Sequence, residues 1–206
     1  MIDVFDRKYI DVLKNEIIKI GKESSSFRYV TTVGGNISAK IDDDNYLITA
    51  TEIPLNELDF YNIVIINQKG ELIEGGINPS KETGLHLAIY QKRKEIKAIV
   101  HLHPIISTTL ATINEPITPV CGEQIFFLGN KIGIIPYLKA GGEDLKNRVA
   151  KELSDCDVVI LKNHGSVSVG STLKEAYYRT VKLEMAAYAT VIAKLFGKTI
   201  EPFPLL

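Results

Sequence analysis

The 206-residue sequence predicts an α/β fold in which helices pack on both faces of one antiparallel-rich sheet. Two observations support this prediction. Apolar segments of strand length are interspersed with segments of helical periodicity, and the first strands follow one another directly, as strands in hairpins do. No internal repeat or low-complexity stretch is visible, so we expect a single domain over residues 1–206.

The first predicted element is an amphipathic helix that Gly21 is expected to end. Its apolar residues at helical spacing are Ile10, Leu13, Ile17 and Ile20. Three strands are expected next, in NISAKI (36–41), NYLITA (45–50) and NIVIIN (62–67). The turn sequences DDDN and QKGE separate neighbouring strands, which favours antiparallel pairing.

The rest of the chain alternates helices and strands. Ser80 is expected to cap a helix in SKETGLHLAIYQKR, and the strand KAIVHLH leads into a helix with Pro104 in its first turn. Ser171 is expected to cap the last helix, which runs to about Phe196 and stops at Gly197. Strands are also expected in IGIIPY, DVVILKN and SVSVG, with a helix in GGEDLKNRVAKELSD.

Composition argues against several classes of partner. The 24 basic and 25 acidic residues give a net charge of −1, so no basic field is present to bind nucleic acid or an acidic membrane. The first residues carry charges throughout, and no segment reaches the ~18 apolar residues of a membrane span. Cys121 and Cys156 are expected to be reduced thiols. We therefore expect a soluble, cytoplasmic protein.

The segment AIVHLHP places His101 and His103 at the end of an apolar strand. Residues i and i+2 of a strand point to the same side, so both rings can converge on one ion. Imidazole is the commonest neutral ligand of zinc and similar metals. This pair alone is weak evidence, because single strand-end histidines are more often simply hydrogen-bonded.

Two further motifs strengthen the metal interpretation. KNHG places His164 just after another apolar strand, followed by a glycine that permits close backbone approach. PSKE places Glu82 in the first turn of a helix, upstream of the histidine pair. Three histidines and one carboxylate are a standard set for a catalytic metal site. His86, four residues after Glu82, is expected to be a partner or packing residue rather than a ligand.

A third marked segment, TTVGGNIS, has two glycines before Asn36. It is either a turn or a loop whose backbone N–H groups bind an anion. The motifs GGNIS, ITATEIP, PSKE, HLHP and KNHG, in this order, make the sequence resemble the class II aldolase/adducin family from about residue 5 to residue 197. That family includes L-fuculose-phosphate aldolase and L-ribulose-5-phosphate 4-epimerase.

The resemblance implies a three-layer α/β/α fold with a mostly antiparallel central sheet, and a homotetramer with active sites between subunits. It implies a Zn²⁺ ion, or another divalent transition metal, on His101, His103 and His164. Glu82 matches the acid/base carboxylate, which can also contact the metal. The positions that match the cradle of the substrate phosphate are Gly35, Asn36, Thr51, Glu52, Ser80 and Lys81.

The chain departs from the family's aldolases, which usually have Thr-Gly and Ser-Ser where this chain has Thr-Glu and Ser-Lys. An ionised Glu52 would repel a phosphate unless it pairs with Lys81 or turns away. Lys81 could instead supply a charge for phosphate or carboxylate. The tyrosine that family aldolases use near PVCGEQ is absent here, and a tyrosine from elsewhere, such as Tyr137, could substitute.

The resemblance implies a zinc-dependent aldolase that cleaves a phosphorylated ketose, similar to L-fuculose 1-phosphate, into dihydroxyacetone phosphate and an aldehyde. Decarboxylation, epimerisation and dehydration of a sugar or sugar-acid phosphate need the same electron sink and stay open. The SKE form also resembles members that decarboxylate 3-oxo-tetronate phosphates. A non-catalytic adducin-like module would not need the three histidines and Glu82. A cupin-type oxygenase would be all-β, with a glutamate closely following the histidine pair.

Overall fold

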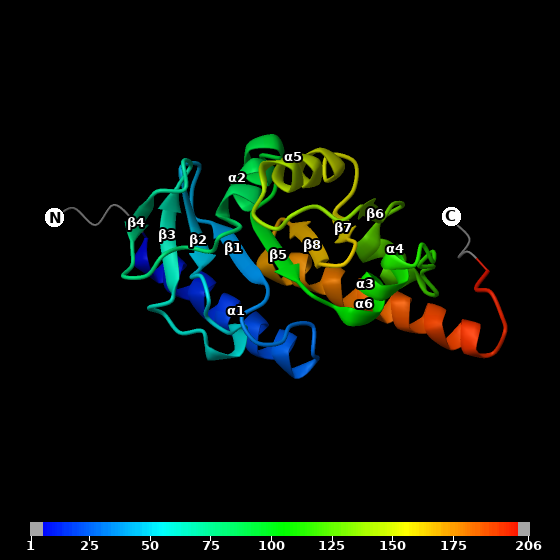
Figure 1. The fold of residues 1–206 in the computed structure, drawn as a ribbon. Coiled ribbons are helices and arrows are strands. Elements are labelled where there is room, and N and C mark those ends of the chain that lie inside the picture. The colour runs from blue at the N-terminus through cyan, green and yellow to red at the C-terminus, as the bar shows by residue number, and fades with distance from the viewer. Residues whose placement is uncertain (1–5, 202–206) are drawn as a thin grey trace.

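The computed structural model describes residues 6–201, and the strands among them form one eight-stranded sheet (Figure 1). The order across the sheet is β4-β3-β2-β1-β5-β8-β7-β6. The strands are β1 (Asn36–Lys40), β2 (Asn45–Thr49), β3 (Ile63–Asn67), β4 (Leu72–Glu74), β5 (Ala98–Leu102), β6 (Gly133–Ile135), β7 (Val158–Leu161) and β8 (Gly165–Gly170). All neighbouring pairs of these strands are antiparallel except β6 and β7, which are parallel. The mostly antiparallel sheet is confirmed.

Helices cover both faces of the sheet (Figure 1). They are α1 (Arg7–Ser26), the short 3₁₀ helix η1 (Leu55–Glu57), α2 (Thr83–Lys92), α3 (Ile105–Thr112), α4 (Gly122–Leu128), α5 (Glu143–Glu152) and α6 (Leu173–Leu195). One core joins α2 and α5 to one face, and a second joins α1 and the start of α6 to the other. This arrangement is the predicted three-layer α/β/α architecture. None of the helices in the described part of the chain has both the length and the apolar content that crossing a bilayer requires.

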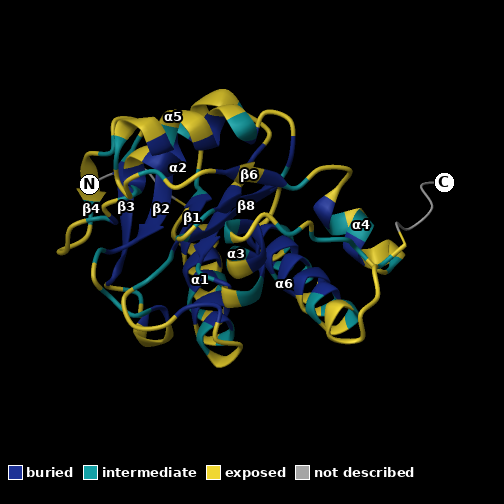
Figure 2. Cartoon of the chain, turned by 45° about the vertical axis from the view of Figure 1, so that its right-hand side comes forward, coloured by how far each residue is buried: buried dark blue, intermediate teal, exposed yellow. Residues whose placement is uncertain are grey.

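The central strands are buried on both faces, as the dark blue sheet in Figure 2 shows. In β3, Val64 and Ile66 enter the core beneath α2, whereas Ile63 and Ile65 enter the core against α1. Each buried side chain of this size contributes roughly 1.5–3 kcal/mol. Burial on both sides explains why NIVIIN is a continuous apolar run without polar alternation.

Gly21 does not end the first helix, contrary to the prediction. The helix continues to Ser26. A Cβ atom on Gly21 would overlap the carbonyl oxygen of Leu55. The glycine is therefore needed for the close approach of α1 to η1, a long-range requirement that has the same local signature as a helix stop.

Two predicted caps lie one or two residues from the observed ones. The helix after Ser80 begins at Thr83 with Glu82 at the N-cap, and the Ser80 hydroxyl instead accepts a hydrogen bond from the Glu82 backbone N–H at 3.2 Å. Thr172, not Ser171, caps α6 by accepting from the backbone N–H of Glu175 at 3.1 Å. Helix α4 was not predicted, because its seven residues are too few to show helical periodicity.

Candidate active site

Three histidines meet where the end of β5 lies beside the turn between β7 and β8. His101 lies in β5, His103 directly follows that strand, and His164 lies in the turn. Antiparallel pairing of β5 with β8 brings the turn to this end of β5. The three ring centroids lie 4.9 to 5.1 Å apart, and one ligand nitrogen from each ring lies within 4.8 Å of the others.

The His101 ring is oriented by the main chain of β8. Its Nδ1 lies 2.8 Å from the carbonyl oxygen of Ser166, which only accepts hydrogen bonds. Nδ1 therefore carries a proton and donates it to that oxygen. The Nε2 atom faces the cluster, 3.1 Å from Nε2 of His103. A backbone partner on one imidazole nitrogen is the usual way in which a protein orients the other nitrogen toward a metal.

Glu82 projects from the N-terminus of α2 toward the histidines. Its Oε2 lies 3.2 Å from Nε2 of His101 and accepts a hydrogen bond of 2.9 Å from the side-chain amide of Asn36. Its Oε1 lies 3.9 Å from Nε2 of His164. Oε1 is buried and has no hydrogen-bond partner among the described residues. The two oxygens of this carboxylate are therefore in different situations, one held and one free.

The charges in the cluster favour a protonated His101 beside an ionised Glu82. Burial lowers the pKa of His101, but the facing Glu82 carboxylate outweighs it and raises that pKa above the usual value. Burial raises the pKa of Glu82, but His101 and Asn36 together hold it well below the usual value. Burial and the charge of His101 lower the pKa of His103 to about 3 and that of His164 to about 4. These two imidazoles are therefore neutral at pH 7.

Two glycines allow the backbone to pack directly against the His103 ring. A Cβ atom on Gly34 would lie 2.7 Å from Nδ1 of His103, and a Cβ on Gly165 would lie 2.7 Å from Cδ2 of the same ring. Both distances are shorter than real Cβ contacts. The glycine of KNHG thus permits the close approach that the sequence indicated, and the first glycine of GGNIS has a matching role.

The residues predicted to cradle a phosphate lie on two adjacent loops. An isolated bridge pairs Ala50 with Pro79, which brings Thr51 and Glu52 beside Ser80 and Lys81. The Lys81 ammonium lies 2.6 Å from Oε1 of Glu52, and both side chains are exposed. The carboxylate that would repel a phosphate is thus paired with a cation.

Gly35 and Asn36 lie at the start of β1, next to the histidines. Gly35 has a positive φ of 78°, and a Cβ atom there would lie 2.8 Å from the His101 carbonyl oxygen. Asn36 is buried, and its two amide atoms contact Glu82 and His86. His86 contacts Asn36 and Ser38, so it is a hydrogen-bonding partner, as the sequence indicated.

A hollow of about 430 Å³ opens beside the histidines. It is lined by His103 and His164 and by isoleucine and threonine side chains of α3 and its C-cap, including Ile105, Thr109 and Ile113. Ile105 and Ile113 are more than 60% exposed. A small molecule in this hollow would contact both imidazoles and these isoleucine and threonine side chains.

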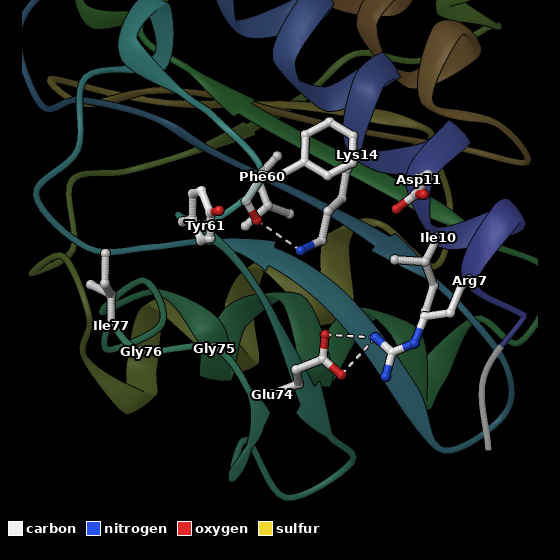
Figure 3. Close-up of a pocket in the computed structure, with 11 residues that line it drawn as sticks. Arg7, Ile10, Asp11, Lys14, Phe60, Tyr61, Glu74, Gly75, Gly76 and Ile77 are labelled. Atoms are coloured by element: carbon white, nitrogen blue, oxygen red, sulfur yellow. Dashed lines mark hydrogen bonds and ion pairs between the residues drawn. The ribbon is translucent and has the colours of Figure 1, made fainter. Parts of the chain in front are cut away.

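A second hollow, of about 510 Å³, lies between α1 and the β4 edge of the sheet and lacks histidine (Figure 3). Three of its four charged side chains, those of Arg7, Lys14 and Glu74, have protein partners. The guanidinium of Arg7 binds both carboxylate oxygens of Glu74 at 2.7 Å, and the Lys14 ammonium donates to the carbonyl oxygen of Phe60 at 2.8 Å. The histidine cluster is therefore the better candidate for chemistry.

The residues around the cluster fit a divalent transition metal. Three imidazole nitrogens lie close enough to share one ion, and the Ser166 carbonyl orients the first of them. Glu82 Oε1 and His164 Nδ1 are buried polar atoms without a hydrogen-bond partner in the described chain. Such orphaned atoms are uncommon in proteins, and a bound ion or substrate would account for the carboxylate oxygen.

The sequence did not indicate the hydrogen-bond partners of this cluster. The Ser166 carbonyl is a backbone group, so no residue type reveals it. Asn36 was matched to a phosphate cradle, although its amide holds Glu82 in the structure. One signal was available: Asn36 and Ser38 alternate with the apolar Ile37 and Ala39 along β1 and so share a face.

Comparisons with known proteins agree with this geometry. The family model described as "Class II Aldolase and Adducin N-terminal domain" matches residues 15–191. The L-fuculose phosphate aldolase of Methanocaldococcus jannaschii is 41% identical over 185 residues, which cover 90% of this chain and 99% of that protein. The 3-oxo-tetronate 4-phosphate decarboxylase of Haemophilus influenzae is 32% identical over 179 residues, 84% of each chain. A solved L-fuculose 1-phosphate aldolase superimposes with a TM-score of 0.84 at 31% identity, covering 93% of this chain and 90% of that one.

Proposed function

The chain belongs to the class II aldolase and adducin family, and we propose that it is a zinc-dependent lyase that cleaves a phosphorylated ketose similar to L-fuculose 1-phosphate. The products would be dihydroxyacetone phosphate and an aldehyde. The observation that carries this proposal is the juxtaposition of Glu82 with His101, His103 and His164, in which Oε1 of the carboxylate has no hydrogen-bond partner among the described residues. A binding module without chemistry has no need of this set.

His101, His103 and His164 would hold the cation, which would supply a Lewis acid for the negative charge that develops when the carbon–carbon bond breaks. Glu82 performs the proton transfer. Its Oε2 is engaged by Asn36, so Oε1 is the atom that exchanges a proton with the substrate carbon. Burial of Oε1 beside the histidines keeps bulk water from competing for that proton.

The loops of Thr51–Glu52 and Ser80–Lys81, together with Gly35 and Asn36, would bind the phosphate. Lys81 supplies the positive charge, and its pairing with Glu52 is exposed and exchangeable with a bound anion. The hollow along α3 would take the aldehyde part of the substrate, with Ile105 and Ile113 facing its apolar end.

Decarboxylation of a 3-oxo-acid phosphate is the second candidate, and the Lys81–Glu52 pair favours it. Family aldolases usually have serine and glycine at these two positions, and a lysine can bind the carboxylate that such a substrate carries. The relative from Haemophilus influenzae is named for this activity. Loss of carbon dioxide leaves the same charge on the substrate as aldol cleavage does, so the same histidines and Glu82 would serve.

We also propose that the chain forms a homotetramer in the cytoplasm, with active sites between subunits. Ile105 and Ile113 are large, exposed apolar residues beside the site. Cys121 and Cys156 are free, as is usual for cytoplasmic proteins. Light scattering coupled to size exclusion tests the assembly: four chains per particle are expected, and a monomer at all concentrations would contradict it.

The activity is tested by incubating the zinc-loaded protein with L-fuculose 1-phosphate and, separately, with a 3-oxo-tetronate 4-phosphate. Released dihydroxyacetone phosphate and carbon dioxide are measured by independent coupled assays. We expect turnover of the ketose phosphate with triose phosphate release. Carbon dioxide without triose phosphate would assign the second candidate instead. Neither product from either substrate, with zinc bound, would overturn both.

A further inference from the structure

A line of buried polar side chains runs from the core to Glu82. Its members come from β1 and α2, which these side chains join by hydrogen bonds. Tyr90 OH lies 2.8 Å from the Ser38 hydroxyl, which lies 2.6 Å from Nδ1 of His86. Nε2 of His86 lies 2.6 Å from Oδ1 of Asn36, whose Nδ2 lies 2.9 Å from Glu82 Oε2. Ser38, His86 and Tyr90 are at most 2% exposed.

The direction of every hydrogen bond in this line follows from the charge of Glu82. A carboxylate only accepts, so the Asn36 amide nitrogen must face it and the amide oxygen must face His86. That oxygen also only accepts, so Nε2 of His86 carries the ring proton. Nδ1 then accepts from the Ser38 hydroxyl, which in turn accepts from the Tyr90 phenol. Burial lowers the pKa of His86 to about 3, consistent with a neutral ring.

If the hydrogen bonds of this line ran in the opposite direction, the contact between Asn36 and Glu82 would be repulsive. If Nδ1 of His86 carried the proton, Nε2 would need a donor, and Asn36 would have to turn its amide nitrogen toward the ring. Its oxygen would then face Glu82 Oε2 at 2.9 Å, with two acceptors in contact. Two buried acceptors in contact without a proton between them are strongly destabilising. Only one direction satisfies all five groups while Glu82 is ionised.

We propose that Ser38, His86 and Tyr90 are positioning residues that, through Asn36, hold Glu82 with Oε2 fixed and Oε1 directed at the reacting atoms. The proposal rests on the catalytic role proposed for Glu82. The Ser38 hydroxyl donates to Nδ1 of His86 and so stabilises the tautomer that Glu82 and Asn36 require. That tautomer keeps the Asn36 amide nitrogen on Oε2, which leaves Oε1 as the free carboxylate oxygen. The side-chain hydrogen bonds of these three residues go to one another and to Asn36, and none of those described goes to the histidine cluster, so they act on catalysis through Asn36 and Glu82.

The tautomer is tested first, without any assay of activity. Nitrogen NMR of the zinc-loaded protein with labelled histidine distinguishes a protonated Nε2 from a protonated Nδ1. We expect His86 to carry its proton on Nε2 in the intact protein. A proton on Nδ1 would overturn the proposed direction. The result does not depend on whether the protein is a lyase. It therefore distinguishes failure of the proposed hydrogen-bond direction from failure of the proposed function.

The effect on catalysis is tested with Ser38→Ala, which removes one hydroxyl, and Ser38→Thr, which retains it. We expect Ser38→Ala to lower kcat about 10- to 100-fold, with KM within about twofold of the parent and zinc content unchanged. Ser38→Thr should restore most of the rate. Ser168→Ala is the matched control, because Ser168 is equally buried and hydrogen-bonded, on the other face of the sheet, to Thr180.

Two kinetic results would overturn the proposal. One is a Ser38→Ala protein that folds, binds zinc and retains full kcat. The other is an equal loss of kcat in Ser168→Ala, which would show that any lost buried hydroxyl slows the enzyme. Tyr90→Phe provides a second test at the far end of the line, because it removes only the phenol donor to Ser38 and should lower kcat by less than Ser38→Ala does.

Discussion

His101 donates a hydrogen bond of 2.8 Å from Nδ1 to the backbone carbonyl oxygen of Ser166. The partner is part of β8, which pairs directly with β5, so the same sheet contacts that build the core also orient the ring. No side chain has to be ordered for this, and the ring therefore faces the cluster before any ligand binds. The pairing of β5 with β8 therefore fixes the orientation of His101 in the candidate metal site.

Replacing Glu82 by Gln should lower kcat by about 10²- to 10⁴-fold, because the amide cannot exchange a proton with the substrate carbon. Zinc content should remain at one ion per chain, since the three histidines are intact. Steady-state kinetics and metal analysis on the same preparation measure both quantities. Glu71→Gln, in the turn between β3 and β4, serves as the control. A Glu82→Gln protein with nearly full kcat would show that another group moves the proton.

Replacing Gly34 by Ala should weaken zinc binding by about 10- to 100-fold, because the added Cβ would lie 2.7 Å from Nδ1 of His103 and displace its ring. Competition with a chromophoric chelator measures the affinity. Gly76→Ala is the matched control, since a Cβ there meets no atom within 4 Å. Equal affinities for the two variants would mean that the His103 ring can shift without cost or does not hold the ion.

The sequence predicted the three-layer fold and the convergence of the histidines for identifiable reasons. The β3 segment is a continuous apolar run, which is typical of a strand buried on both faces, and the H-x-H spacing places two rings on one side of β5. Gly21 misled the prediction, because a glycine required by contact with Leu55 has the same local pattern as one that ends a helix.

The hydrogen-bond partners of the site could not be predicted to the same extent. Asn36 lies 46 positions from Glu82 and pairs with it only because β1 packs against α2. The Ser166 carbonyl is a backbone group and has no sequence signal. The sequence left open whether Glu52 pairs with Lys81 or turns away. The structure has the ion pair, because the bridge between Ala50 and Pro79 brings the two loops together.

Removing the positive charge of Lys81 with Lys81→Met should raise KM for a phosphorylated substrate by about tenfold or more, with a smaller effect on kcat, since the group binds substrate without touching the reacting atoms. Glu52→Gln should lower KM, because it releases Lys81 from its ion pair. KM is therefore expected to rise in Lys81→Met and to fall in Glu52→Gln. Lys69→Met, in an exposed turn, controls for net charge. Unchanged KM in both variants would remove these two residues from the phosphate site.

Zinc affinity should rise with pH until the raised pKa of His101 is passed. The carboxylate of Glu82 raises the pKa of His101, so in the metal-free protein that imidazole keeps its proton above the usual pKa near 6.5. Zinc must displace this proton, and binding is weaker at every pH below the raised pKa. His103 and His164 add no dependence in this range, because their pKa values are about 3 and about 4.

Because zinc displaces one proton from His101, the slope of zinc affinity against pH can also be predicted. The logarithm of the affinity should increase by about one unit per pH unit in the range where only His101 titrates. In Glu82→Gln the rise should move to lower pH, since the carboxylate that raises the His101 pKa is gone. Affinity in the parent protein that stays flat on both sides of the usual histidine pKa, about 6.5, would show that His101 does not bind the ion.

The most direct test is anomalous diffraction from zinc-soaked crystals at the zinc absorption edge. The imidazoles at the end of β5 and in the turn before β8 are expected to share one divalent ion within reach of the Glu82 carboxylate. We predict a single strong peak per chain, bonded to ring nitrogens of His101, His103 and His164. Zinc-loaded crystals with no peak among these three rings, or with the ion held by other residues, would show that the three imidazoles do not form the metal site.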